Sequence, residues 1–144
     1  MVYVKREVEL TRQQMKYYKL LKTKLIMNIT GEQVTAMNSA VGMNKLLQIS
    51  AGAVYTDDGE TLEFDIQHRY KVLKEVIDES SKKVLVFVPF KHVIDILTDK
   101  LRSDGIATNI IRGDVSAPQR TAIFKQIQET DSPRVLVIQP QAAA

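Results

Sequence analysis

The chain has 144 residues, of which 44% are apolar and 26% charged, with a formal net charge of +3. This composition is ordinary for a soluble globular protein, and the length suits one domain with a proper core. The chain has no cysteine, which excludes disulfides, zinc-thiolate sites and cysteine nucleophiles and favours a cytoplasmic location. The small basic excess permits a nucleic-acid partner without requiring one. The N-terminus has no signal-peptide pattern, and no apolar run reaches the length of a membrane span.

Residues 1–65 predict an edge strand followed by two helices. Weak alternation of apolar and polar residues over Val2–Leu10 favours the strand. Thr11–Gln14 has the pattern of a capping box, which begins a helix that runs to about Thr30. A second helix is expected over Glu32–Ile49. The side chains expected to be buried recur every three or four residues; they are Met15, Tyr18, Leu21, Leu25 and Ile29, then Val34, Met37, Val41, Leu46, Leu47 and Ile49.

Two further features lie in this part of the chain. An Asp-Gly turn within Thr56–Glu60 separates Val54–Tyr55 from Thr61–Phe64, which predicts a short hairpin. The first helix also carries several lysines, for which a solvated face is favoured over a phosphate-binding surface; they are Lys16, Lys19, Lys22 and Lys24.

Residues 66–144 predict an α/β fold with a parallel sheet. Three apolar runs, Val84–Val88, Ile106–Ile111 and Arg134–Ile138, have the length of strands. The first is a continuous run of β-branched and aromatic residues, so we expect it to be buried on both faces of the sheet. Helical patterns precede and separate the runs, which gives two βαβ crossovers. These helices are expected over Ile66–Ser80, over Phe90–Asp104 and after the capping box Ser116–Gln119.

No catalytic or metal-ligating residue is predicted. The sequence has no Gly-x-x-x-x-Gly-Lys-Ser/Thr loop to hold a triphosphate and no acidic pair after a buried strand to hold magnesium. His68 and His92 do not have the spacing of metal ligands. The chemistry that remains lies in the loops Pro89–Lys91, Arg112–Asp114 and Gln139–Gln141, because ligands of open α/β sheets bind at the carboxyl ends of the strands. Ordinary turn and solvation roles for these loops stay open.

The order of these segments resembles the second RecA-like lobe of Swi/Snf-type ATPases in helicase superfamily two, in the form common in phage-encoded members. One departure is a leucine in the second helix where the family usually has arginine. The first lobe and the motif-six arginines are also missing. The segments that carry the resemblance are Leu10–Tyr18, Lys45–Ile49, Tyr70–Lys74, Lys83–Phe90, Arg112–Phe124 and Arg134–Ala142.

The resemblance implies an incomplete RecA-like three-layer lobe over residues 66–144, preceded by a helical lead-in over residues 1–65. It implies a fragment of a DNA-dependent ATPase, a helicase or translocase, whose intact parent binds ATP and Mg²⁺ with a first lobe. We expect the fragment to hold no cofactor and to be inactive alone. The residues that would face DNA are Phe87, Pro89, Phe90, Lys91, Arg112, Gly113, Gln139 and Gln141.

Two alternatives remain open: a non-enzymatic doubly wound module that binds a nucleotide or protein, and an unrelated small α/β enzyme with its site at the same edge. We further expect weak, sequence-independent DNA binding. Because the chain stops just after the apolar run Val135–Ile138, we expect a truncated lobe. Such a lobe should self-associate through the surface left uncovered there.

Overall fold

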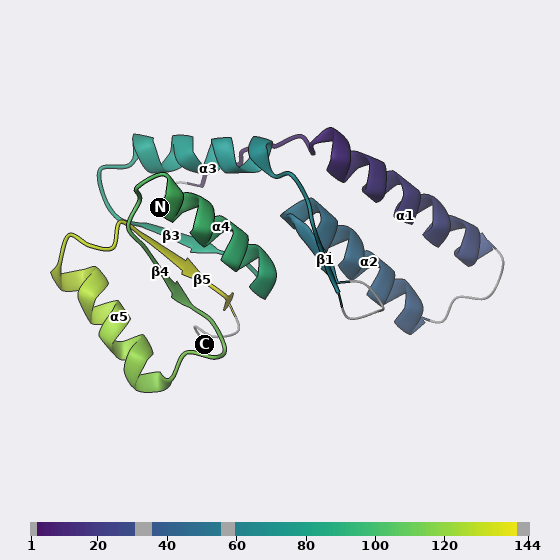
Figure 1. The fold of residues 1–144 in the computed structure, drawn as a ribbon. Helices are drawn as coiled ribbons and strands as arrows, with labels where there is room; N and C mark the ends of the chain where they lie inside the picture. The colour runs from purple at the N-terminus through teal and green to yellow at the C-terminus, as the bar shows by residue number, and fades with distance from the viewer. Residues whose placement is uncertain (1–2, 31–35, 56–59, 141–144) are drawn as a thin grey trace. The chain divides into compact units, whose positions relative to one another are not determined.

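A computed structural model of the chain describes residues 3–30, 36–55 and 60–140, and the side chains of 25–30 and 36–39 are left out of the description. The chain divides into two compact units, Met1–Leu73 and Lys74–Ala144, which are described separately. Figure 1 shows the succession of helices and strands. No helix in the described residues has the length and apolar character needed to cross a membrane.

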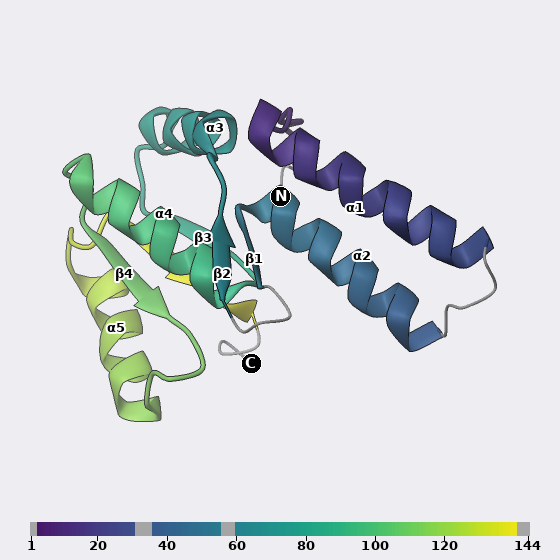
Figure 2. The same ribbon diagram turned by 45° about the vertical axis from the view of Figure 1, so that its right-hand side comes forward.

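The first unit contains a pair of helices and a small hairpin. Its elements are α1 (Arg12–Thr30), α2 (Ala36–Ala51), β1 (Ala53–Tyr55) and β2 (Thr61–Glu63). Helices α1 and α2 lie side by side (Figure 2). Strands β1 and β2 are antiparallel, with Val54 opposite Leu62. The two helices and the hairpin are thereby confirmed, while the turn at 56–59 and the start expected for the second helix at Glu32 lie outside the described residues.

The edge strand expected over Val2–Leu10 is wrong for the residues that the structure describes there. Residues 3–10 have no strand pairing, and Tyr3 and Val4 are 87% and 73% exposed. A strand needs a neighbour to satisfy its backbone hydrogen bonds, and the weak alternation provides little apolar surface to hold one.

The buried stripe of α2 differs from the predicted one. Leu46 and Ile49 are buried as expected, but Val41 and Leu47 are 52% and 60% exposed. Gly42 is also buried, so the true stripe has the spacing i, i+4, i+7 from residue 42. In α1, Met15 is exposed and Tyr18 and Leu21 are only half-buried. The side chains at 25, 29, 34 and 37 lie outside the described set.

Gly52 makes the sharp turn from α2 into β1. Its φ of 136° lies in the region that disfavours L side chains, and an added Cβ would lie 2.6 Å from Ile66 Cγ2. The Phe64 amide donates to the Gly52 carbonyl at 2.8 Å. The turn and hairpin are therefore packed directly on Ile66, which is fully buried.

The second unit is a parallel sheet with alternating helices. Its strands are β3 (Val84–Phe87), β4 (Thr108–Ile111) and β5 (Val135–Ile138), and its helices are the end of α3 (Gln67–Glu79), α4 (Lys91–Ser103) and α5 (Ala117–Glu129). The strand order is β3-β5-β4, and both pairs are parallel. The three strands and two βαβ crossovers are confirmed.

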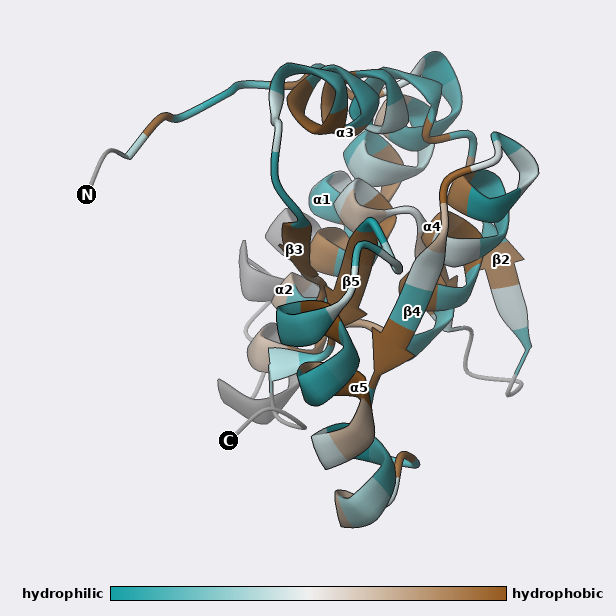
Figure 3. Ribbon diagram, turned by 90° about the vertical axis from the view of Figure 1, so that its left-hand side faces the viewer, coloured by the Kyte–Doolittle hydropathy of each residue, from teal (hydrophilic) through white to brown (hydrophobic). Residues whose placement is uncertain are grey.

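The position of β5 in the middle of the sheet follows from the two crossovers. The chain crosses from β3 to β4 and then returns to β5, so right-handed connections put α4 and α5 on opposite faces. Figure 3 shows the sheet between these helices, with hydrophobic residues along the strands. All four residues of β5 are buried. Ile111, Leu136 and Ile138 form a cluster on the α5 face, against which Ile123, Phe124 and Ile127 pack.

Burial of the first apolar run on both faces is wrong. In β3, Leu85 and Phe87 are 49% and 59% exposed, while Val84 and Val86 are half-buried. The reason is that β3 lies at an edge of the three-stranded sheet and α5 packs on the cluster of β4 and β5. In the described residues of this sheet, the uncovered apolar surface is thus on β3. The sequence had suggested that it would lie at the C-terminal strand.

The helix ends agree with the sequence signals. Ser116 and Gln119 form the reciprocal hydrogen bonds of a capping box at α5, and Pro118 lies in its first turn. Gly105, with a φ of 79°, follows α4 as the expected stop. Phe90 is the N-cap of α4, and its side chain makes no capping hydrogen bond.

Candidate nucleic-acid interface at the carboxyl edge

Gln139 joins the three loops that follow the strands. Its Oε1 accepts a hydrogen bond from the Gly113 amide at 3.3 Å, and its Nε2 donates to the Pro89 carbonyl at 3.5 Å. Its own amide donates to the Ile111 carbonyl at 2.8 Å. Since parallel strands end at one edge of a sheet, these loops were expected to meet, and here one side chain links them.

Arg112 is held by two carboxylates beside that junction. Its Nε donates to Asp114 Oδ1 at 3.0 Å, and its Nη1 donates to Asp95 Oδ1. Burial by itself would lower the pKa of Arg112, but the hydrogen bonds and charges of Asp95 and Asp114 outweigh this effect and raise it. Lys91 Nζ lies 3.9 Å from Asp114 Oδ2. The edge therefore carries two cations and two carboxylates in one cluster.

The carboxylates are the part of the cluster that the sequence analysis missed. Asp95 reads as an ordinary surface residue of a helix, and Asp114 as part of a turn. A signal for Asp95 existed, since it lies four residues after Lys91 in α4 and hence on the same side of the helix. The consequence is chemical: the cluster is nearly neutral, so its attraction for phosphates is weaker than that of two free cations.

The start of α4 adds a second polar feature at the same edge. The Phe90 side chain does not accept from the first-turn amides, and this turn contains no acidic residue. Helix N-termini with this character attract anions through their amide groups and the helix dipole. Lys91, the first residue of the helix, is exposed. This is the arrangement expected for phosphate contact at the Pro89–Lys91 loop.

The remaining predicted residues are placed as follows. Phe87, the last residue of β3, exposes 59% of its surface just before the junction. Phe90 is half-buried, and Pro89 and Gly113 are exposed. Gln141 lies outside the described residues. The structure therefore brings together Pro89, Lys91, Arg112, Gly113 and Gln139.

The residues present do not fit ATP and magnesium as ligands held by this chain alone. In the described ranges, no group of three or more acidic, histidine or cysteine side chains is placed to hold a metal ion. The arginine nearest the edge, Arg112, already pairs with Asp95 and Asp114. Among its described residues, the edge thus has helix amides and Lys91 for an isolated phosphate, and no cradle for a triphosphate.

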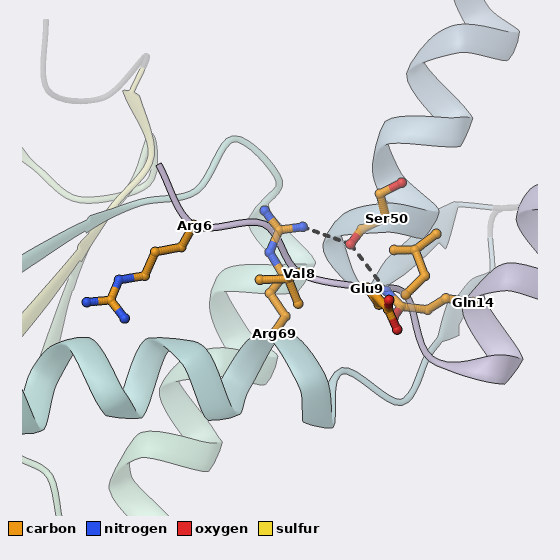
Figure 4. Close-up of a pocket in the computed structure, with 7 residues that line it drawn as sticks. Arg6, Val8, Glu9, Gln14, Ser50 and Arg69 are labelled. Carbon is orange, nitrogen blue, oxygen red and sulfur yellow. Dashed lines mark hydrogen bonds between the residues drawn. The ribbon is translucent and has the colours of Figure 1, made fainter. Parts of the chain in front are cut away.

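The first unit has a pocket of about 310 Å³, and several of the polar side chains that line it are engaged in hydrogen bonds within the chain (Figure 4). Gln14, 2% exposed, donates from Nε2 to the carbonyls of Ile49 and Ser50 at 2.9 and 3.2 Å. The Thr11 amide donates to Gln14 Oε1 at 3.1 Å and the Gln14 amide to Thr11 Oγ1 at 3.3 Å, which confirms the capping box.

Arg69 completes this network. Its Nη1 donates to the Ser50 carbonyl at 2.8 Å, and burial lowers the pKa of Arg69. Its guanidinium points at the end of α2 (Figure 4). These groups fasten the start of α1 to the end of α2, so we assign them a structural role.

The fold and the edge define a RecA-like α/β lobe, and comparison with protein families agrees. The model of the helicase conserved C-terminal domain matches residues 68–142, just over half of the chain. The chain therefore belongs to the helicase conserved C-terminal domain family.

Curated relatives match part of the chain. Putative protein p41 of Acyrthosiphon pisum secondary endosymbiont phage 1 is 29% identical over 89 residues, which are 61% of this chain and 19% of p41. Probable ATP-dependent RNA helicase DDX17 of Mus musculus is 30% identical over 63 residues, or 44% of this chain and 10% of the helicase. This chain spans a fifth or less of each of these relatives.

Solved structures extend the similarity to nearly the whole chain. The Sulfolobus solfataricus SWI2/SNF2 ATPase core in complex with dsDNA has a TM-score of 0.72 at 21% identity, covering 91% of this chain and 29% of that chain. The C-terminal domain of the same ATPase has a TM-score of 0.68 at 19% identity, covering 91% of this chain and 60% of that chain. The predicted fold class is confirmed, and the fold is similar to that of the C-terminal domain of a SWI2/SNF2 ATPase, as the sequence resemblance implied.

Proposed function

We propose that this chain is the nucleic-acid-contacting lobe of a DNA-dependent ATPase of the helicase or translocase type. Family membership and the fold support a helicase part. The observation that carries the more specific proposal is the carboxyl edge, where Gln139 links three loops next to the uncapped start of α4. The similar archaeal core was solved with double-stranded DNA, which makes DNA the first partner to test.

The edge would hold a strand through its phosphates. First-turn amides of α4 and the exposed Lys91 are sequence-independent phosphate donors. The Phe87 ring, exposed at the end of β3, offers a face on which a base or sugar can pack. Because Arg112 is paired with carboxylates, few counterions are released on binding, so the affinity should be low and should fall with added salt along a shallow slope.

ATP would be held mainly by residues outside this chain, on a first lobe. In such motors, closure of two lobes over the nucleotide changes the contacts with the nucleic-acid strand. This lobe would therefore bind the strand and move as a rigid body. ATP and Mg²⁺ then belong to the assembled parent, and a cytoplasmic location fits the absence of cysteine in the sequence.

RNA is the second candidate partner, because one relative is a probable RNA helicase. Contacts to phosphates do not by themselves discriminate between DNA and RNA, because they involve neither the base nor the 2′-hydroxyl. The alternative of a non-enzymatic nucleotide- or protein-binding module is less favoured, because the family match places the chain among helicase domains.

The test is a binding titration at low salt with fluorescent single-stranded DNA, duplex DNA and RNA. Lys91→Glu should weaken binding to the preferred nucleic acid severalfold, because it reverses a charge at the proposed phosphate site. Lys82→Glu is the matched control: the same charge change on an exposed lysine before β3, at the opposite end of the strands. Equal losses in the two variants would reject the carboxyl edge as the binding site.

A further inference from the structure

The first unit has an apolar groove that the proposed function does not use. It has a volume of about 380 Å³ and is lined by side chains of α1, of α2 and of the hairpin, among them Tyr17, Leu20, Leu21 and Leu62. This volume is at the lower end of the range for binding pockets. The lining is mainly aliphatic and aromatic, which is unusual for a surface that faces water.

The groove combines a fixed floor with an exposed apolar rim. The ring of Tyr17 packs edge-on against that of Phe64, with centroids 5.2 Å apart, and Phe64 is buried. Leu20, one turn further along α1, is 60% exposed. From Tyr17 to Lys24 the lining of α1 extends over two helical turns, about 10 Å. That length matches side chains at i, i+3 or i+4, and i+7 of a docked helix.

The two helices that line the groove carry charges of one sign, whereas the hairpin strand β2 carries Glu63 next to the lining residue Leu62. Lys24 and Lys45 are the charged side chains among the described lining residues, and Lys24 is exposed. The sequences of α1 and α2 contain no aspartate or glutamate. Their basic residues are Arg12, Lys16, Lys19, Lys22, Lys24 and Lys45. A partner that complements the helix side of this groove therefore carries a carboxylate for Lys24 beside an apolar centre.

We propose that this groove docks an amphipathic helix of a partner protein, with apolar anchors along one side and carboxylates beside them. The apolar anchors would enter between Leu20 and Leu62, and a carboxylate would pair with Lys24. A nucleic acid fits less well, because most of the lining is aliphatic or aromatic surface, which phosphates do not bind. The groove lies in the first unit, so this docking does not depend on DNA contact at the carboxyl edge.

The test uses the whole chain, labelled with ¹⁵N, and a synthetic acidic peptide of about four helical turns whose leucines share one helix side. The control peptide has the same amino-acid composition, but its leucines are spread around the helix. We expect the first peptide to bind, to shift amide signals of α1 and the hairpin, and to bind at least several times more tightly than the isomer.

Two pairs of variants give matched controls. Leu20→Ser should weaken peptide binding about tenfold, whereas Leu47→Ser should not, although both leucines are 60% exposed and only Leu20 lines the groove. Lys24→Glu should weaken binding severalfold, whereas Lys22→Glu, on the same helix and outside the lining, should change it little. Because the exposures are equal, loss of folding would affect both leucine variants alike.

Three results would overturn the proposal. One is equal binding of the two peptides, which would show that charge alone attracts them. Another is an equal effect of the two leucine variants. The third is a shift of the groove amides by single-stranded DNA and not by the peptide, which would assign the groove to nucleic acid. Failure of DNA to bind the carboxyl edge would leave this proposal unchanged.

Discussion

Replacing Leu136 in β5 or Leu85 in β3 by alanine compares how much each strand's burial contributes to the free energy of unfolding. The two leucines are paired in register, yet Leu136 is fully buried and Leu85 is 49% exposed. Leu136→Ala removes three carbons from a filled cluster and should cost about 2–5 kcal/mol, including the cavity that remains. The same deletion at Leu85 removes carbons worth about 0.8 kcal/mol each when buried. With half of the side chain exposed, its cost should be about 1 kcal/mol.

The assay is urea unfolding followed by circular dichroism, which reports the free energy of unfolding and its dependence on denaturant. At a slope of about 1–3 kcal/mol per M, a difference in cost of about 1–4 kcal/mol separates the two midpoints by about 0.3–4 M. The slopes themselves should stay unchanged. Equal costs for the two variants, or a larger cost at Leu85, would refute the strand order β3-β5-β4 and the covering of β5 by α5.

Three further outcomes are expected. Asp95→Asn leaves one more uncompensated positive charge near Arg112, so DNA binding should strengthen and its salt dependence steepen by about one released ion; a titration in which the salt slope is unchanged would show that DNA does not reach this cluster. The purified chain should hydrolyse no ATP with or without DNA, because its residues do not fit a triphosphate site, and magnesium-dependent phosphate release that follows the chain through purification would contradict this. Self-association, if it occurs, should use β3, so Phe87→Ser should lower the association seen in sedimentation over a concentration series; an unchanged association would exclude the exposed face of β3.

The strands show what apolar runs can and cannot predict. The existence and parallel arrangement of β3, β4 and β5 follow from short apolar runs separated by helical patterns. All four residues of Val135–Ile138 are buried, whereas the expected burial on both faces is wrong for Val84–Phe87, although the two runs look alike. The difference is the position of each strand in the sheet, which depends on crossovers and helix packing and cannot be read from the run itself.

Helices α1 and α2 show a similar division. Their presence was predicted from spacing and from the Thr11–Gln14 capping box, which forms as expected. The buried side was partly wrong, because Val41 and Leu47 are exposed, while Gly42 is buried together with Leu46 and Ile49, which were expected. A glycine adds no hydrophobicity to a pattern, so the burial of residue 42 leaves no signal that a count of apolar residues detects.

The candidate site was predicted as a set of loops and not as a set of contacts. That the Pro89, Arg112 and Gln139 loops meet follows from parallel strands ending at one edge. That Asp95 pairs with Arg112 depends on the rotation of α4 over the sheet, which the sequence does not specify. The near-neutral charge of the edge was therefore unforeseen.

The most direct test of the proposed function is an NMR titration of the ¹⁵N-labelled chain with single-stranded and duplex DNA at low salt. The account predicts that the largest shifts fall on the amides of Lys91, Gly113 and Gln139, and that added salt reverses them. It would be contradicted if those amides stayed unchanged while the signals of the α1 lysines, or of residues 82–84 before and at the start of β3, moved with DNA.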